Sequence, residues 1–204
     1  VIRYMPMPGE RPESVRAVVP RLPQLLVLQG EPEAGRFVQH VEFRGIAFEH
    51  TDYQLGPEGL SDSQAASSIN AAVEWTGARF CRLEDCQIAH TGNYGVWFRR
   101  GGSQNNLMRR CTVYDLGAGG ARIGECGNPA SENEAADWNT IDNCIFMDGG
   151  RIFREAVGLW IGRASWNRLA HNEVGWFRYT GISVGWSWGY APSSAHHNII
   201  EYNH

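Results

Sequence analysis

The chain has 204 residues and a formal net charge of −4 at pH 7, and all 18 of its Lys/Arg side chains are arginines. The absence of lysine excludes Schiff-base, pyridoxal-phosphate and P-loop chemistry, which need an ammonium group. The negative charge argues against nucleic acid as a partner. No apolar run reaches the roughly 18 residues of a membrane span. We therefore expect one domain, or part of one, that binds neither nucleic acid nor membrane.

The beginning of the chain differs in composition from the remainder. Residues 1–35 are rich in proline and include the apolar run 25–28, which predicts an entry segment followed by a first strand. Residues 36–204 carry a repeat that stops at His204 before its second apolar position. We therefore expect residues 36–204 to form a repeat domain that is truncated at its C-terminal end, as in an excerpt of a longer polypeptide.

One short pattern recurs through the chain: an apolar residue, two variable residues, a small or amide residue, one variable residue and a second apolar residue. Its starting positions are 40, 25, 33, 28 and 31 residues apart. A constant core with variable spacing is typical of one structural unit that accepts loop insertions. The pattern starts at Phe43, Leu83, Met108, Ile141, Leu169 and Ile200.

A second phrase, glycine followed by alternating apolar residues, follows the middle units. It begins at Gly95, Gly120, Gly158 and Gly181. The segments between the two patterns show no 3.6-residue periodicity, so no amphipathic helix is expected there. Each unit is thus expected to hold two or three very short strands. The sequence predicts an all-β fold, a parallel β-helix (solenoid) of about six coils with projecting loops.

Two segments lack the repeat, residues 51–70 and 124–138, and these are expected to project as loops, where binding sites are commonly built. The five cysteines form no CxxC pair. Cys86, Cys111 and Cys144 occupy the small-residue position of the repeat. We interpret them as core residues, not as disulfides, zinc ligands or reactive thiols.

Polar side chains recur two residues after the second apolar position of the repeat. Because these positions are equivalent on successive coils, we expect one row of side chains along the axis. Solvated turns explain such residues, and so does a catalytic groove. In a groove, Asp115 and Asp148 are expected roughly 5 Å apart, as in a retaining glycosidase, with their repulsion raising one pKa. Glu155 follows in the next loop. The row comprises His50, His90, Asp115, Asp148 and Trp176.

A parallel row of residues comes from the glycine phrase, where Trp97, Arg122 and Trp160 alternate outward. Exposed tryptophan rings suit the C–H face of a sugar, and an arginine can bond hydroxyl or carboxylate oxygens. Packing beneath loops is the alternative. Trp186 and Trp188 add aromatic residues near the end of the chain.

Cofactor sites are not indicated. The glycine-rich stretch 117–120 lacks the lysine and the following helix of a phosphate loop. His50, His90 and Asp115 are expected to project side by side, not toward one point, which disfavours a metal site. We therefore expect neither a cofactor nor a metal.

Three motifs resemble a known family: the segments 90–97, 115–125 and 181–190 are similar to right-handed parallel β-helix proteins of bacterial polysaccharide breakdown. The resemblance is to the group of glycoside hydrolases that includes α-L-fucosidases and xylanases, and it covers residues 25–204. It implies a secreted or periplasmic enzyme that uses paired carboxylates. Members of this group continue with further coils that carry acidic residues, so one catalytic carboxylate could lie outside this chain.

The function expected from the sequence is a glycoside hydrolase that acts on a complex polysaccharide or oligosaccharide. Two alternatives stay open: a noncatalytic carbohydrate-binding or adhesin-like β-helix, and a polysaccharide lyase or epimerase acting on uronates. Exposed solenoid ends also allow end-to-end self-association. The catalytic candidates are Asp115, Asp148 and Glu155, and the substrate-binding candidates are His50, His90, Trp97, Arg122, Glu125, Trp160, Trp186 and Trp188.

Overall fold

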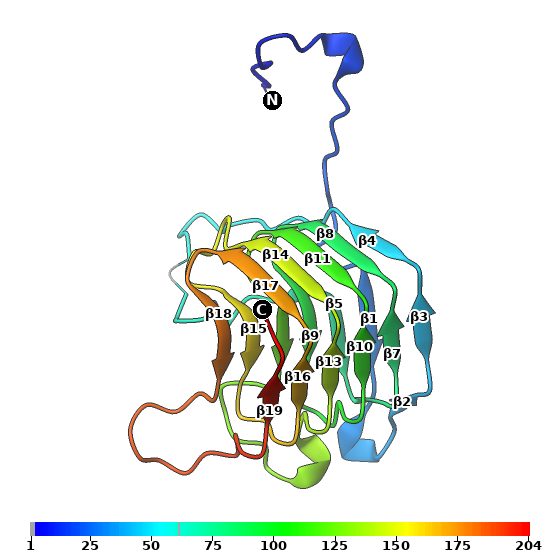
Figure 1. Ribbon diagram of the computed structural model, residues 1–204, viewed down its shortest axis with the longest axis vertical. Coiled ribbons are helices and arrows are strands. Elements are labelled where there is room, and N and C mark those ends of the chain that lie inside the picture. Colours follow the sequence, from blue (N-terminus) through cyan, green and yellow to red (C-terminus); the bar gives the residue numbers. More distant parts are fainter. Residues whose placement is uncertain (1–2, 61) are drawn as a thin grey trace.

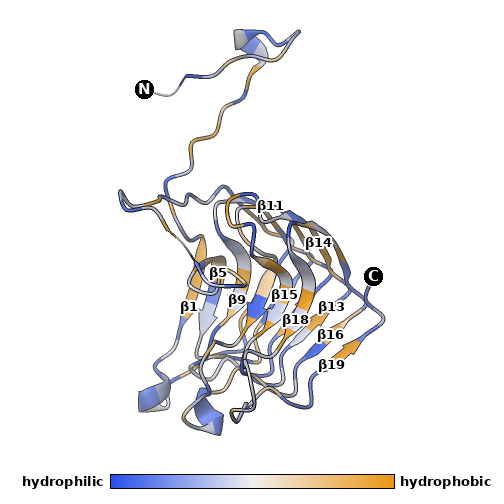
Figure 2. Cartoon of the chain, turned by 90° about the vertical axis from the view of Figure 1, so that its left-hand side faces the viewer, coloured by the Kyte–Doolittle hydropathy of each residue, from blue (hydrophilic) through white to orange (hydrophobic). Residues whose placement is uncertain are grey.

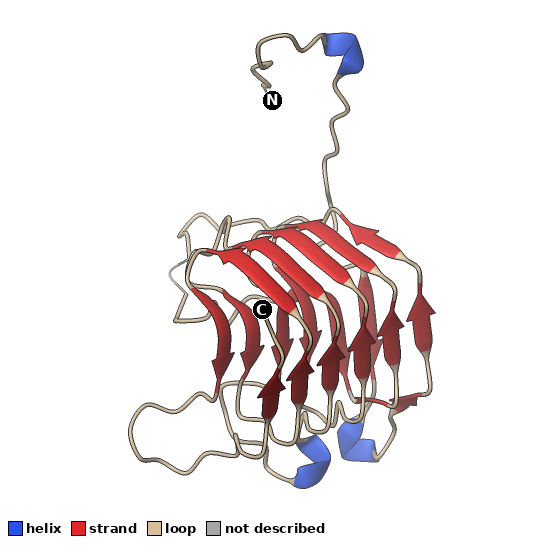
Figure 3. Ribbon diagram, in the orientation of Figure 1, coloured by secondary structure: helices blue, strands red, loops and turns tan. Residues whose placement is uncertain are grey.

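The chain folds into a parallel β-helix, as the computed structural model shows for residues 3–60 and 62–204 (Figure 1). Strands stack into two six-stranded sheets and one five-stranded sheet, and a fourth sheet has two strands. All pairings between named strands are parallel, for example Met108 with Leu83 on one side and with Ile141 on the other. Six coils and an all-β architecture are therefore confirmed, and the helices are short 3-10 turns outside the sheets (Figure 3).

We name the three large sheets by their order along each coil. Sheet 1 contains β1 (Leu26–Gln29), β5 (Ala71–Thr76), β9 (Tyr94–Phe98), β12 (Ala121–Ile123), β15 (Val157–Ile161) and β18 (Thr180–Val184). Sheet 2 contains β3 (Glu42–Arg44), β7 (Arg82–Glu84), β10 (Leu107–Arg109), β13 (Thr140–Asp142), β16 (Arg168–Ala170) and β19 (Ile199–Glu201). Sheet 3 contains β4 (Ala47–Glu49), β8 (Gln87–Thr91), β11 (Thr112–Leu116), β14 (Ile145–Gly149) and β17 (Glu173–Phe177).

The remaining elements lie outside these sheets. The small sheet pairs β2 (Val38–Gln39) with β6 (Ala78–Arg79) between sheets 1 and 2. The 3-10 turns are η1 (Pro12–Ser14), η2 (Pro32–Ala34) and η3 (Glu132–Glu134). The N-terminal segment that holds η1 runs away from the solenoid (Figures 1 and 2). The entry strand predicted near residues 25–28 is β1, which pairs with β5.

The register follows the repeat. The first apolar positions of the pattern are paired along sheet 2, and the second apolar positions are paired along sheet 3, as Val113 is with Ile88 and Phe146. In the middle coils these side chains point inward and are fully buried, together with Trp75 and Phe98 from sheet 1, whose rings lie 4.9 Å apart. In the last coil Ile200 is 42% exposed. Removing this apolar surface from water is the main stabilising term of such a fold.

The bend between sheets 2 and 3 explains the small residues of the repeat. Cys86, Cys111 and Cys144 are buried there, which confirms their assignment to the core. Farther along, the Oδ1 atom of Asn172 accepts a hydrogen bond from the Cys144 backbone N–H at 3.0 Å. Asn203 repeats this contact with the Asn172 backbone N–H, also at 3.0 Å.

A second asparagine ladder, absent from the sequence-based predictions, lies at the bend between sheets 1 and 2. Asn139 accepts hydrogen bonds from the backbone N–H and the Nδ2 of Asn106 at 3.1 and 2.9 Å. It donates from its own Nδ2 to the Ser103 carbonyl at 2.9 Å and to Asn167 Oδ1 at 3.2 Å. Since the bend is buried, these amides satisfy backbone groups that water cannot reach.

Replacing Asn139 by alanine is expected to lower the free energy of unfolding by about 2–3 kcal/mol, because it leaves buried donors and an acceptor without partners. Urea unfolding monitored by circular dichroism measures this change. Asn133→Ala in η3 is the matched control, since that side chain is exposed and should change stability by less than about 0.5 kcal/mol. Equal stability of the two variants would show that the ladder contributes nothing.

Candidate functional site

The row of polar side chains predicted after the second apolar position exists. It lies at the edge where sheet 3 turns into sheet 1. Strand pairing places His90 beside Asp115. The residues before them, Ala89 and Tyr114, are partners, and so are the residues after them, Thr91 and Leu116. Every member of the row has left-handed backbone geometry, which bends the chain sharply at that residue. The φ angles are 68° at His50, 55° at His90, 54° at Asp115, 57° at Asp148 and 58° at Trp176.

The first three members of the row are in direct contact, and Arg151 connects the third to the fourth. The rings of His50 and His90 stack with centroids 4.9 Å apart and an interplanar angle of 13°. His90 Nδ1 lies 2.6 Å from Asp115 Oδ2. Arg151 continues the chain of contacts, with its Nε 2.8 Å from Asp115 Oδ1 and 3.2 Å from Asp148 Oδ2. Four ionisable groups of neighbouring coils are thus joined into one network with Arg151.

This network lies in a surface cleft of about 360 Å³, which His50, His90, Asp115 and Arg151 help to line. Asp148 is connected to the cleft through Arg151. Pro20, together with Asp52 and Tyr53 at the start of the loop 51–70, also lines the cleft. A neighbouring hollow of about 350 Å³ shares Asp52 and Tyr53, so the depression extends toward the N-terminal segment.

The floor of the cleft is held by buried hydrogen bonds. Thr51 Oγ1 donates to Asn93 Oδ1 at 2.8 Å, and the Gly92 backbone N–H donates to the Thr51 carbonyl at 3.1 Å. Tyr53 packs edge-on against Phe153 with ring centroids 4.8 Å apart. These contacts hold the start of the loop 51–70 against the turns after β8 and β14.

The electrostatics of the aspartate pair differ from the prediction. Mutual repulsion between Asp115 and Asp148 was expected, but the Arg151 guanidinium bonds both carboxylates and offsets it. Hydrogen bonding to Asp148, with the charges of both aspartates, raises the pKa of Arg151 above its ordinary value. Both carboxylates keep access to solvent, with 34% of the Asp115 and 31% of the Asp148 side chain exposed.

Glu155 lies near this turn but is not part of the network. Its neighbour Ala156 forms a parallel bridge with Ala65 of the loop 51–70. Among the described residues, Glu155 makes no ion pair or hydrogen bond with His90 or Arg151, and it does not line the cleft. Arg151 therefore connects the candidate pair Asp115 and Asp148, whereas Glu155 has no contact with Arg151.

The second predicted row also exists, since Arg122 pairs with Trp97 and with Trp160. Its predicted exposure is wrong: Trp97 is 4% exposed, Trp160 1% and Arg122 0%. The guanidinium carbon of Arg122 lies 3.6 Å from the Trp97 ring centroid and 4.8 Å from that of Trp160. In this arrangement the two rings hold an arginine and present no platform to a sugar.

The loop 51–70 covers this stack. Arg122 donates hydrogen bonds to the carbonyls of Ile69 at 2.7 Å and Ser67 at 2.8 Å. Tyr94 donates to the carbonyl of Ala65 at 2.5 Å. Burial lowers the pKa of Arg122. Alternation along a strand indicates which side chains point out of a solenoid, but not whether a loop of another coil lies above them.

Replacing Arg122 by methionine is expected to loosen the loop. Two charge-assisted hydrogen bonds to its backbone are lost, so amide exchange of residues 65–70 should become at least tenfold faster. Hydrogen–deuterium exchange with mass spectrometry measures this rate. Arg154→Met, which removes an exposed arginine from the turn after β14, is the control and should leave the rate unchanged. Unchanged protection in Arg122→Met would show that apolar packing alone holds the loop.

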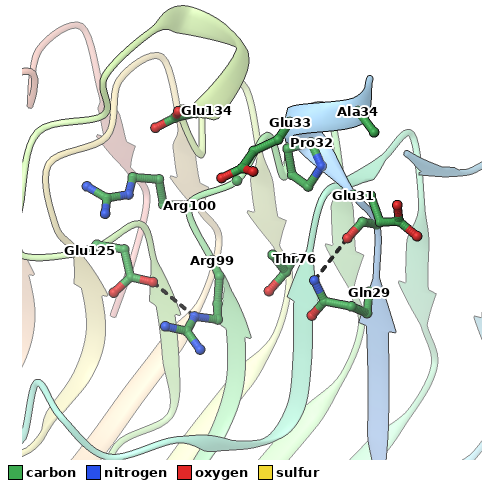
Figure 4. A pocket seen from close by; sticks show the side chains of 12 residues that line it. Gln29, Glu31, Pro32, Glu33, Ala34, Thr76, Arg99, Arg100, Glu125 and Glu134 are labelled. Carbon is green, nitrogen blue, oxygen red and sulfur yellow. Dashed lines mark hydrogen bonds and ion pairs between the residues drawn. The ribbon is translucent and has the colours of Figure 1, made fainter. Parts of the chain in front are cut away.

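Glu125 lies elsewhere, at the edge between sheets 1 and 2. Arg99 joins two carboxylates there, with its Nε 2.9 Å from Glu125 Oε1 and its Nη1 2.9 Å from Glu74 Oε1. Glu125 and Arg99 line a pocket of about 650 Å³ between η2 and the segment containing η3 (Figure 4). Glu33 and Glu134 also face this pocket. The structure thus separates Glu125 from the aspartate cleft.

Trp186 and Trp188 are also remote from the cleft, because they follow the C-terminal end of β18 whereas the cleft lies where strands of sheet 1 begin. Trp186 packs edge-on against Trp160 at 5.4 Å, and Trp188 is 76% exposed. Together they line a hollow of about 220 Å³. Of the predicted site residues, His50, His90 and Asp115 thus line one cleft, and Asp148 joins them through Arg151.

The described residues contain neither a metal-binding cluster nor a helix suited to a membrane. Across residues 3–60 and 62–204, no group of three or more His, Cys, Asp or Glu side chains is arranged to hold a metal ion. Within the same described ranges, none of the helices has the length and apolar character needed to cross a membrane.

The comparisons with known proteins agree with this architecture. Residues 71–204 match the family described as right handed beta helix region, and the chain belongs to that family. A solved structure named "Glycoside hydrolase" superimposes with a TM-score of 0.77 at 22% sequence identity, over 91% of this chain and 38% of that one. The chain therefore spans well under half the length of this neighbour. None of the curated proteins searched matches the sequence.

Proposed function

We propose that the chain is the β-helix of a glycoside hydrolase that acts on a complex polysaccharide in the cleft at the edge between sheets 3 and 1. The observation that carries the proposal is the row itself: two carboxylates on adjacent coils, joined to His90 and Arg151 beside an open cleft. Adjacent parallel strands lie about 4.8 Å apart, which suits the roughly 5–5.5 Å carboxyl separation of retaining enzymes. The structural neighbour supports this assignment through its fold and its name.

In the proposed reaction Asp115, which lines the cleft, attacks the anomeric carbon of the sugar. Asp148, once Arg151 has released it and it has taken up a proton from water, protonates the oxygen of the leaving sugar as the glycosidic bond breaks, so that a glycosyl-Asp115 ester forms. Water then attacks the anomeric carbon of this ester and gives its proton to Asp148, while the bond between that carbon and Asp115 breaks and Asp115 leaves as a carboxylate. Arg151 holds both carboxylates before substrate binds and has to release Asp148 for this step. His90 orients Asp115 through their 2.6 Å contact.

A second candidate function is elimination at a uronate, and the His90–Asp115 pair favours it. Asp115 occupies Nδ1 of His90, which leaves Nε2 outside that contact and suited to accept a proton. Arg151 carries a positive charge that can neutralise a uronate carboxylate. In this reaction His90 removes the proton next to the carboxylate, the electron pair of that C–H bond forms a C=C double bond, and the bond to the glycosidic oxygen breaks, with that oxygen taking a proton from water.

Turnover on neutral and acidic oligosaccharides separates these functions. The glycoside hydrolase proposal predicts new reducing ends without the ultraviolet absorbance of an unsaturated uronate, whereas elimination produces reducing ends together with that absorbance. Saccharide binding without any cleavage would instead indicate the noncatalytic carbohydrate-binding role. Since polysaccharides of this kind lie outside cells, the proposal includes a secreted or periplasmic location. End-to-end self-association stays a prediction.

A further inference from the structure

A third row of side chains runs along the edge between sheets 1 and 2, next to the second asparagine ladder. Each member lies two residues before the first residue of a strand of sheet 2, and each has left-handed backbone geometry. Most members carry a flat ring. The φ angles are 57° at His40, 55° at Phe80, 58° at Asn105, 58° at Trp138, 59° at Trp166 and 53° at His197.

Backbone geometry alone does not explain tryptophan at these turns. Asn105 occupies the same turn one coil before Trp138, and asparagine enters the left-handed region at lower cost than a bulky residue. Burial does not explain the tryptophans either, because Trp138 is 43% and Trp166 45% exposed. Trp166 stacks on His197 at 4.1 Å, but none of the ring pairs among the described residues includes Trp138.

A hollow of about 280 Å³ lies against these two rings. Its walls come from the loop 124–138 and from the loop 185–198, through residues such as Ser131, Ser194 and His196. The rings of Trp138 and Trp166 thus lie beside groups that can donate and accept hydrogen bonds. Flat apolar rings next to polar groups are what the two kinds of surface of a pyranose require, its C–H face and its hydroxyls.

Asp137 gives this hollow an acceptor that the fold does not use fully. The residue is 8% exposed and lines the hollow. Its Oδ1 accepts a hydrogen bond from the Ser165 backbone N–H at 2.7 Å. For Oδ2 no hydrogen-bond partner occurs within residues 3–60 and 62–204. Burial raises the pKa of Asp137. The Oδ2 atom faces the solvent of the hollow, so it can accept a hydrogen bond from a ligand that enters there.

We propose that this hollow, with Trp138, Trp166 and Asp137, is a saccharide-binding site separate from the aspartate cleft. The sugar packs its C–H face on the tryptophan rings and donates a hydroxyl to Asp137. Glu132 also lines the hollow. The carboxyl groups of Glu132 and Asp137 repel a uronate, so the site selects neutral sugars. The site lies at a different solenoid edge from Asp115. It therefore does not depend on the function proposed for the cleft.

Calorimetric titration with xylohexaose, cellohexaose and mannohexaose tests the site, with tetragalacturonic acid as the acidic probe. We expect at least one neutral hexasaccharide to bind and the acidic probe not to bind at this site. The double variant Trp138→Ala/Trp166→Ala should weaken binding of the neutral probe at least tenfold. Asp137→Asn should weaken it severalfold, because the amide is a weaker acceptor than the carboxylate.

Trp176→Ala is the matched control, since Trp176 is 80% exposed and has the same left-handed geometry but lies at the edge between sheets 3 and 1. It should leave binding at the proposed site unchanged, as should Asp115→Asn. Absence of binding by all three neutral probes would overturn the proposal. So would neutral-probe binding that is equal in the double variant and the parent chain, or that is lost only in Asp115→Asn.

A measurement on the unaltered chain guards against misfolded variants. The bound neutral hexasaccharide should protect Trp138 and Trp166 from oxidation by N-bromosuccinimide, as read from peptide masses, and should leave Trp176 as reactive as before. Equal reactivity of Trp138 and Trp166 with and without saturating probe would contradict the site. The hydrolytic activity of the Asp115→Asn variant tests the function proposed for the cleft. It does not affect the protection of Trp138 and Trp166 that this site predicts.

Discussion

Asp115→Asn is expected to lower kcat on the polysaccharide substrate at least 100-fold and to leave the fold intact. Asp115 is the point at which His90 and Arg151 converge, and it lines the cleft. Asparagine keeps the shape of the side chain but cannot attack the anomeric carbon as a carboxylate does. Steady-state release of reducing ends, compared at equal protein concentration, measures the loss.

Glu173→Gln is the matched control for Asp115→Asn. Glu173 is an exposed carboxylate of β17 in the same sheet, on a coil farther along the axis. The Glu173→Gln variant should therefore retain full activity. Asp148→Asn should also lose activity, but addition of azide should restore turnover if Asp148 acts on the ester intermediate. Hydrolysis by Asp115→Asn at the parental rate would show that the reaction does not use this row.

Glu84→Gln is expected to lower the free energy of unfolding by about 2–3 kcal/mol, the largest loss we predict for an isosteric change. Its side chain is fully buried, and it accepts hydrogen bonds from Arg44 at 2.9 Å, Arg109 at 3.1 Å and Arg110 at 3.2 Å. Glutamine leaves these guanidinium groups without the charge that holds them together. This expected loss of stability is smaller than the loss from breaking a fully buried ion pair, because the three arginines are partly solvated.

Urea unfolding at pH 7 measures this loss, with Glu42→Gln as the control. Glu42 lies in the same sheet and pairs with Arg44 at 2.7 Å, but its side chain is 43% exposed. Removing such a surface pair should cost less than about 1 kcal/mol. A Glu84→Gln variant as stable as Glu42→Gln would show that the arginine cluster does not depend on the buried carboxylate.

The same carboxylate predicts a pH dependence. Burial by itself raises the pKa of Glu84, but the hydrogen bond and charge of Arg109, with the charges of Arg44 and Arg110, outweigh it and leave this pKa below its ordinary value. The unfolded chain therefore takes up the proton first as the pH falls. The contribution of Glu84 is complete above about pH 4.5 and is lost at lower pH, as the folded-state pKa is crossed. Between pH 6 and 3.5, Glu84→Gln should consequently lose less stability than the parent chain.

Much of the fold follows from the sequence because a β-helix repeats its register. Leu83, Met108 and Ile141 begin the same short pattern, and stacking of equivalent positions makes them partners along one sheet. The same argument places His90 beside Asp115, since both follow a paired apolar residue by two positions. The row and its alignment were therefore predictable from spacing alone.

Burial by loops was not predictable in the same way. Trp97 and Trp160 point out of the solenoid as expected, yet the loop 51–70 lies above them and Arg122 fills the space between. Nothing in the local spacing of these residues indicates where a loop inserted one or two coils earlier comes to rest. The bridging role of Arg151 was likewise hidden, since it depends on a turn with no repeat.

The second asparagine ladder had a signal that the first pattern concealed. Asn106, Asn139 and Asn167 each lie two residues before the first apolar position of a unit, so they follow the spacing of the repeat. Trp138 and Trp166 lie directly before two of these asparagines. A search for residues at equal distance before the pattern, as well as after it, identifies both the ladder and the ring-bearing edge.

The most direct test of the catalytic role of the row is a crystal structure of the Asp115→Asn chain with the oligosaccharide that the parent chain cleaves best. We predict that sugar rings occupy the cleft, with an anomeric carbon beside residue 115, the next glycosidic oxygen within hydrogen-bond distance of Asp148, and Arg151 turned away from one carboxyl group. A saccharide found only at other edges of the solenoid, with His90, Asp148 and Arg151 as they are in the free protein, would contradict the account.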